Sequence, residues 1–204
     1  MRLSLSVASA VLLAATAWSQ SETAAVDDEI IVNAPPANTG IAVEIQRMHN
    51  AYHDGEQGSR LYRVKRYAEA FPYLLRNAKR GFKGAQARIA YYYLSGMDPV
   101  AEDLERAVGW FGVAAHGSSA PWIRAWYHDV LRQIPDQSQP RAREVVAWYV
   151  AHYAARDLGV WCDMAAHAGT HIKRLRCRYE REIDYNRLFG GSLMDAAAAA
   201  GSSP

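Results

Sequence analysis

The sequence predicts an all-α fold, a short right-handed solenoid of about three antiparallel helix pairs, with a small C-terminal disulfide-linked β-hairpin. Two observations predict the helices. Apolar residues recur at spacings of three and four, the period of an amphipathic helix, and Gly- or Pro-containing breakers divide the chain into helix-length segments. A third observation predicts the hairpin, because Cys162 and Cys177 stand symmetrically about Gly169 and Thr170.

The composition limits the classes of function. The chain has 204 residues, 50% of them hydrophobic, which is enough for one domain with a buried core. The net charge of +2 argues against a general nucleic-acid-binding protein. Twelve tyrosines and six tryptophans are many for this length, and such residues fill the cores and binding grooves of helical repeats.

Residues 1–17 have the features of a secretory signal peptide. Arg2 supplies the positive start, and the apolar run from Leu3 to Ala14 is too short to span a bilayer as a stable helix. Ala15-Thr16-Ala17 is a typical cleavage site, with a second possible cut after Ser19; a retained membrane anchor is the alternative. We therefore expect a periplasmic or secreted chain with no integral membrane span after cleavage.

Four segments follow the predicted signal peptide. Acidic, proline-containing sequence predicts a disordered linker, and a final stretch rich in Ala, Gly and Ser predicts a disordered tail. The predicted boundaries are 18–40 for the linker, 41–158 for a helical repeat domain, 159–189 for a Cys-bridged C-terminal module and 190–204 for the tail.

The first helix pair is predicted to end at Gly81. An apolar stripe predicts its first helix from Ile41 to Asp54. The segment from Gly55 to Ser59 contains two glycines and predicts a loop. A second helix is expected from Leu61 to Gly81, with Pro72 either starting a fresh helix or bending this one.

The central pair runs from Gly81 to Gly117. Ala85, Ile89 and Tyr93 share one helix face, and a second apolar stripe follows the breaker that begins at Gly96. Small residues at a helix contact allow two backbones to approach closely, and such a pair needs neighbours to bury its apolar face. The small residues are Ala90, Ala107, Ala114 and Ala115.

A third pair is predicted after the central one. Trp122, Trp126 and Val130 repeat at intervals of four, which predicts a helix. A breaker from Pro135 to Pro140 separates it from a further helix that ends near Gly159.

The C-terminal module is predicted to form an antiparallel hairpin. In the symmetric register Cys162 faces Cys177, at disulfide range, and the bridge would contribute about 3 kcal/mol in the loop-entropy model. The alternative is a helix through Ala165-Ala166-His167-Ala168. Further apolar pairs on the cysteine face are Met164 with Leu175 and Val160 with Tyr179, and the opposite face carries Arg174, Arg176 and Arg178.

The central pair resembles a Sel-like repeat, a relative of the tetratricopeptide repeat. The residues that carry the resemblance are Gly81, Ala85, Tyr93, Gly96, Asp103, Ala107, Trp110, Phe111, Ala114, Ala115 and Gly117. Repeats of this family serve as interaction scaffolds, so the resemblance implies an architecture and a non-catalytic function. The segment from Cys162 to Tyr185 is similar to a C-terminal module of exported proteobacterial proteins, which implies the same compartment.

First helices of stacked repeats usually line the concave side, and side chains outside the core stripe are the candidates for binding. Tyr and Arg are common among binding hot spots. The candidate binding residues are Arg88, Tyr91, Tyr92, Arg124 and His128.

Two further clusters lie in the C-terminal module. A basic patch could bind an anionic envelope component, and its alternative is a solvated strand face. A group of Cys and His residues offers ligand types that suit zinc, as the alternative to the disulfide. The patch is Lys173, Arg174, Arg176 and Arg178; the possible metal ligands are Cys162, His167, His171 and Cys177.

No nucleophile motif, phosphate loop or paired carboxylates are recognisable, so we expect no enzyme and no cofactor. The leading interpretation is a non-catalytic adaptor that binds another protein of the bacterial envelope and no nucleic acid. The alternative is a periplasmic metal- or ligand-binding protein that uses the Cys/His cluster. The oligomeric state stays open.

Overall fold

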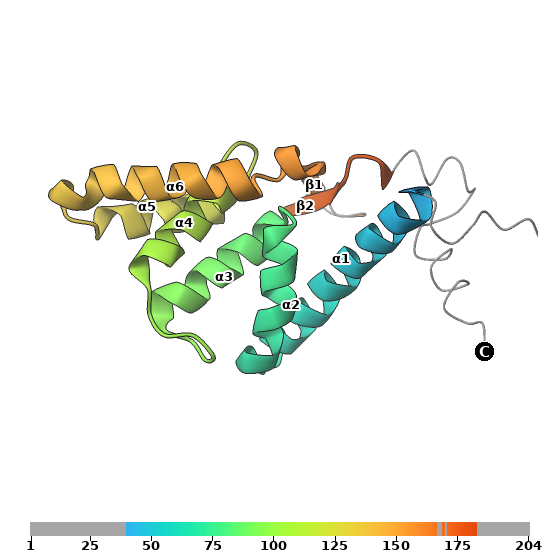
Figure 1. The fold of residues 1–204 in the computed structure, drawn as a ribbon, viewed down its shortest axis with the longest axis horizontal. Coiled ribbons are helices and arrows are strands. Elements are labelled where there is room, and N and C mark those ends of the chain that lie inside the picture. The colour runs from blue at the N-terminus through green and yellow to red at the C-terminus, as the bar shows by residue number, and fades with distance from the viewer. Residues whose placement is uncertain (1–39, 167–168, 170, 183–204) are drawn as a thin grey trace, which may run out of the picture. The chain divides into compact units, whose positions relative to one another are not determined.

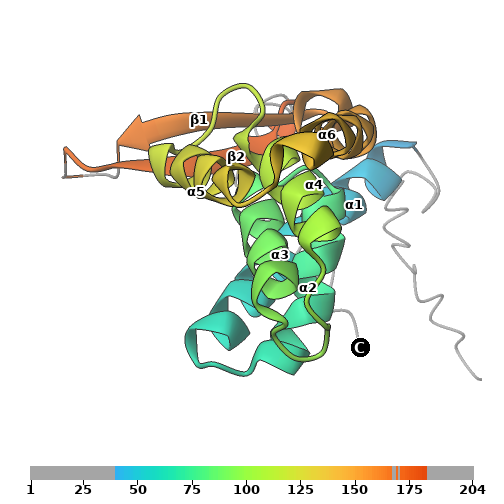
Figure 2. The ribbon, with the colours of Figure 1, turned by 90° about the vertical axis from the view of Figure 1, so that its left-hand side faces the viewer.

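The computed structural model describes residues 40–166, 169 and 171–182 (Figures 1 and 2). The predicted signal peptide, nearly all of the linker, and the tail lie outside these residues, so the predicted boundaries between segments stay predictions. No helix among the described residues combines the length and the apolar character needed to cross a membrane.

Helices make up most of the described chain. The bounds are α1 Gly40–Arg63, α2 Tyr67–Lys79, α3 Lys83–Ser95, α4 Leu104–Ala115, α5 Pro121–Arg132 and α6 Gln139–Tyr153, with short 3₁₀ turns η1 Asp136–Ser138 and η2 Arg156–Leu158. Two strands, β1 Val160–Ala166 and β2 Lys173–Tyr179, form one antiparallel sheet.

The first helix is longer than predicted, and the loop expected from Gly55 to Ser59 is wrong. A Cβ built on Gly55 would lie 2.7 Å from Nδ2 of Asn77, and one on Gly58 would lie 3.0 Å from the Leu74 side chain. These glycines therefore let α1 pack closely against α2, and the helix continues through them.

The break between the first two helices falls after α1 ends, where Lys65 has a positive φ of 63°. Pro72 lies in the second turn of α2, so it does not start a fresh helix.

The central pair forms as predicted. α3 ends at Gly96, which has φ of 57°, the left-handed conformation favoured by glycine. Asp103 caps α4, since its Oδ1 accepts a hydrogen bond of 2.9 Å from the backbone N–H of Arg106. Ile89 and Phe111 are fully buried where the two helices meet the rest of the core. Figures 1 and 2 show α3 between α2 and α4.

Helices are found where the third pair was predicted, but α6 packs mainly against α4. A Cβ on Gly109 would lie 2.4 Å from the Tyr149 ring, and one on Gly112 would lie 2.5 Å from Val146. Since α5 also packs on α4, both last helices share one neighbour. The first four helices pack in succession, and the stacking of the last two differs from a simple third pair.

The hairpin has the predicted register, and the helical alternative for this segment is wrong. Cys162 pairs with Cys177, and their sulfurs form a disulfide. The flanking pairs Val160–Tyr179 and Met164–Leu175 also form as predicted. Val160 and Tyr179 are almost completely buried at the base of the hairpin, so this end is fixed to the helices.

Candidate interaction groove

A groove of about 850 Å³ lies between the helices and the hairpin. It takes Ser59 from α1, Leu74 and Asn77 from α2, and Arg88 from α3. Residues at the start of α5 and both strands of the hairpin complete its lining. The first helix of each predicted pair contributes to the lining, and so does α2, the second helix of the first pair.

The charged side chains that line the groove all carry the same sign. They are Arg88, Lys173 and Arg174, and no Asp or Glu is among the described lining residues. Apolar side chains surround these cations, including Phe82, Met164, Leu175 and the half-exposed Trp122. The site combines positive charge with apolar surface, so it complements a ligand that carries both carboxylates and apolar groups.

Arg88 is the most unusual cation of the groove. Its guanidinium is partly buried, donates a hydrogen bond of 3.0 Å to the Ser59 hydroxyl and lies 5.6 Å from the centre of the Tyr62 ring. Burial lowers the pKa of Arg88 from its ordinary value, because the charge is poorly solvated. Within the described part of the chain it has no carboxylate partner. A cation in this environment favours binding of an anion, with which it can form charge-assisted hydrogen bonds.

An aromatic stripe continues from the groove along α5. Trp122, which is 45% exposed, has its ring centre 5.2 Å from that of Trp126. Trp126, 42% exposed, lies 5.6 Å from the Tyr91 ring on α3. The three rings extend the apolar surface beyond the cations.

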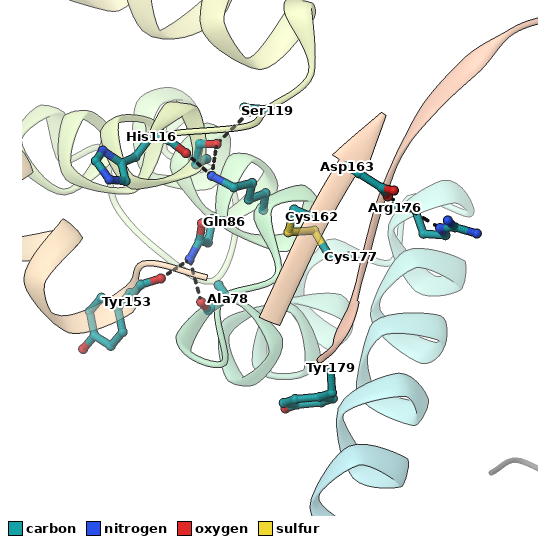
Figure 3. The surroundings of a disulfide bond; sticks show 12 residues. Ala78, Gln86, His116, Ser119, Tyr153, Cys162, Asp163, Arg176, Cys177 and Tyr179 are labelled. Carbon is teal, nitrogen blue, oxygen red and sulfur yellow. Dashed lines mark hydrogen bonds and ion pairs between the residues drawn. A yellow bond between two sulfur atoms is a disulfide. The ribbon is translucent and has the colours of Figure 1, made fainter. Parts of the chain in front are cut away.

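Buried polar contacts beside the hairpin join α3 to the ends of neighbouring helices (Figure 3). Gln86 donates hydrogen bonds of 3.1 Å to the Ala78 carbonyl and 2.8 Å to that of Tyr153, so it joins the ends of α2 and α6. Lys83 donates to the carbonyls of Ala114 and His116 at the end of α4. These bonds join the N-terminal end of α3 to carbonyl groups near the ends of α2, α4 and α6.

The structure brings only some of the predicted binding residues together. Arg88 lines the groove, and Tyr91 contacts the adjoining aromatic stripe. Tyr92 is a core residue, because its side chain is 0% exposed and its hydroxyl donates to the Tyr67 carbonyl at 2.8 Å. Arg124 is exposed and donates to the Ser119 carbonyl, and His128 lines a separate shallow hollow near η1.

Only two of the four residues of the basic patch line the groove. Lys173 and Arg174 line the groove. Arg176 pairs with Asp163 at 3.6 Å on the face opposite the cysteines, and Arg178 is half-buried there. The strand alternation predicted Arg174, Arg176 and Arg178 opposite the cysteines. It did not show that Arg174 lines the groove or that the cysteine face forms one of its walls.

Trp122 was also missed as a groove residue. Its spacing with Trp126 and Val130 indicated a helix, and the helix is present, but Ile123 and Val130 are its buried residues. The exposure of two tryptophans could not be inferred from a periodic apolar pattern.

The alternative metal cluster loses two of its ligands to the disulfide. Because Cys162 and Cys177 are bonded to each other, neither is available as a thiolate. His171 is exposed, and His167 lies outside the described residues. No group of three or more His, Cys, Asp or Glu side chains suited to a metal ion occurs in the part that the structure covers.

The sequence matches no protein-family model and no curated protein, and no solved structure matches the chain. The resemblance to Sel-like repeats therefore rests on the motif residues of the central pair.

Proposed function

We propose that this chain is a non-catalytic interaction module of the bacterial cell envelope, a Sel-like repeat protein that binds an acidic segment of another protein in the groove. One observation carries this proposal. Arg88 is partly buried and has no carboxylate partner among the described residues, while two further cations and several apolar side chains line the same site.

A bound carboxylate would supply the missing partner of Arg88. Hydrogen bonds between a guanidinium and a carboxylate are stronger than neutral ones and have a defined geometry. Exposed Trp122 and Trp126 next to these charges favour a partner with apolar side chains, because tryptophan and arginine dominate protein-binding hot spots. A peptide segment offers both kinds of group along one extended chain.

The test is a selection of nine-residue peptides from a displayed library on the oxidised, mature chain. We expect acidic peptides with interspersed apolar residues, and Arg88→Gln is expected to weaken their binding by about tenfold or more. Arg124→Gln is the matched control, since Arg124 is exposed and lies outside the lining of the groove. Equal effects of the two substitutions, or a selection with no enriched peptide, would contradict the proposal.

The predicted signal peptide belongs to the same proposal. A disulfide is typical of an oxidising compartment, which supports export. The intact mass of the chain recovered from a periplasmic extract tests it, with loss of residues 1–17 or 1–19 expected and an uncleaved chain as the contrary result.

A further inference from the structure

We propose that the acidic segment binds as a third strand on the outer edge of β2, so that the hairpin becomes a three-stranded sheet with one strand from the partner. This inference rests on the proposed function of the groove and adds the conformation of the bound segment. Three features of the outer edge of β2 support strand addition: its position beside the groove, its outward backbone groups and the charges around it.

The groove borders β2. Four residues of this strand, Lys173, Arg174, Leu175 and Cys177, line it, but only Met164 of β1 does. Val160 to Cys162 of β1 line a separate hollow beside η2. The helix α1 marks the outer side of β2, because the Tyr52 hydroxyl of α1 accepts a hydrogen bond of 3.2 Å from the backbone N–H of Tyr179. Two turns further along α1, Ser59 lines the groove.

The pairing pattern shows which backbone groups point outward. The Cα atoms of Cys162 and Cys177 are 4.1 Å apart, the short distance of a non-hydrogen-bonded antiparallel pair. The backbone N–H and C=O of Cys177 therefore point away from β1, and those of Leu175, two positions away, do the same. The outward bond of Tyr179 to Tyr52 and the bond of 3.0 Å from Glu180 N–H to the Gly159 carbonyl fit this alternation.

Leu175 and Cys177 thus present an open strand edge. Tyr52 satisfies the outward N–H of Tyr179, but among the described residues no partner is found for the outward groups of Leu175 and Cys177. An unpaired edge of this kind is a template for another strand. Strand addition would satisfy these groups and leave alternate partner side chains directed at the groove.

The charges favour an acidic segment over a second copy of this chain. β2 carries Lys173, Arg174, Arg176 and Arg178, so pairing it with its own copy would bring like charges together. An acidic strand would instead meet Lys173 and Arg174, which line the groove together with Arg88. The occupant we infer is an extended segment in which acidic and apolar residues alternate.

Amide hydrogen exchange tests the inference directly. The tightest nonapeptide from the selection is added to the oxidised, mature chain, and exchange is followed by NMR for individual residues. We expect exchange at Leu175 and Cys177 to slow by about tenfold or more, while exchange at Arg174 and Arg176 changes little because their amides already face β1. Binding that leaves Leu175 and Cys177 unchanged would overturn strand addition.

A substitution in the chain gives an independent test. Leu175→Pro removes the outward N–H at an edge position that tolerates proline, and Leu175→Ala shortens the side chain but keeps the N–H. We expect about tenfold weaker binding for the first variant and clearly less for the second. An intact disulfide by mass and an unchanged circular dichroism spectrum show that the proline variant is folded.

If the proline variant does not fold, peptides N-methylated at alternate amides replace it. Methylation of the peptide amides that would face β2 is expected to abolish binding. Methylation of the alternate amides, which would face away from β2, is expected to spare it. Strand addition is overturned if binding tolerates the loss of the Leu175 N–H and both methylation patterns. If that binding still needs Arg88, the proposed function of the groove stands. A selection that enriches no peptide contradicts both strand addition and the proposed function of the groove. A dimer of the chain that forms without peptide and protects the same amides would identify a second copy as the occupant and also overturn the inference.

Discussion

Two sites that border α1 contain arginines, and they differ in whether a carboxylate balances the arginine charge. On one side, Asp54 is only 6% exposed and binds two arginines, with Arg76 Nη2 at 2.7 Å and Arg80 Nη1 at 2.5 Å. On the other, the partly buried Arg88 contacts the hydroxyl of Ser59 and the ring of Tyr62 and has no carboxylate partner among the described residues. The first site joins α1 to α2 with its charges compensated, and the second keeps a charge uncompensated beside a groove.

The pKa directions agree with this difference. Burial alone would raise the pKa of Asp54, but hydrogen bonds from Arg76 and Arg80 lower it below its ordinary value. Burial lowers the pKa of Arg88, and no described carboxylate opposes this effect. A compensated buried ion pair holds helices together, whereas an uncompensated cation costs stability that a ligand can recover.

Asp54→Asn should break the compensated site and gives the largest expected effect. Two guanidinium groups would lose their carboxylate at a nearly buried position, and we expect a loss of about 2 to 3 kcal/mol in the free energy of unfolding, measured by urea denaturation. Because the folded-state pKa of Asp54 is depressed, its contribution is present at neutral pH and lost as pH falls through that pKa, so the variant should also lose less stability in acid.

The matched control is Glu69→Gln. It removes a carboxylate from an exposed ion pair with Arg66, and we expect a change below about 0.5 kcal/mol. Similar losses for Asp54→Asn and Glu69→Gln would show that burial does not distinguish these two ion pairs.

Lys83 is an intermediate case, a cation that is 4% exposed and bonded to carbonyls alone among its described partners. Burial lowers its pKa to about 8, from an ordinary value of 10.5. Between these values the unfolded chain binds more protons, so its contribution to stability rises with pH, by at most about 1.4 kcal/mol per pH unit.

Lys83→Met should remove this rise. Urea denaturation of the variant and the parent chain is compared at several pH values between the folded and unfolded pKa of Lys83. Both cysteines are in the disulfide, so no free thiol exchanges at these pH values. The same slope in both proteins would exclude Lys83 as its source.

Arg88→Met tests the uncompensated site and is expected to leave the fold at least as stable. It removes a poorly solvated charge and keeps an apolar stem, so we expect unchanged or slightly higher stability, by up to about 1 kcal/mol, together with loss of peptide binding. Urea denaturation and binding to the selected nonapeptide measure the two quantities. A loss of stability as large as that of Asp54→Asn would make Arg88 a structural residue.

The sequence was sufficient for the parts of the fold that depend on local pattern. The central helix pair follows from its apolar period and its glycine stop, and the hairpin register follows from the placement of two cysteines about one turn. Gly55 and Gly58 were misinterpreted because a glycine needed for close helix packing has the same local signature as one in a loop.

The candidate site was predictable only in part. Arg88 follows from its place outside the core stripe, but Tyr92 shares that property and is buried, because the core face of α3 is wider than one stripe. The groove also depends on how the hairpin, α1 and α5 come together, and no local pattern contains that information.

Two glycines of α1, which have no Cβ, lie next to the residues that form the Arg88 site. Gly58 directly precedes Ser59, the residue whose hydroxyl accepts from Arg88, and Gly55 lies against Asn77 in the groove lining. A methyl group at Gly58 would lie 3.0 Å from the Leu74 side chain, so Leu74 or the packing of α1 against α2 would have to adjust beside Ser59. The geometry of the proposed binding site therefore depends on two helix positions that have no side chain.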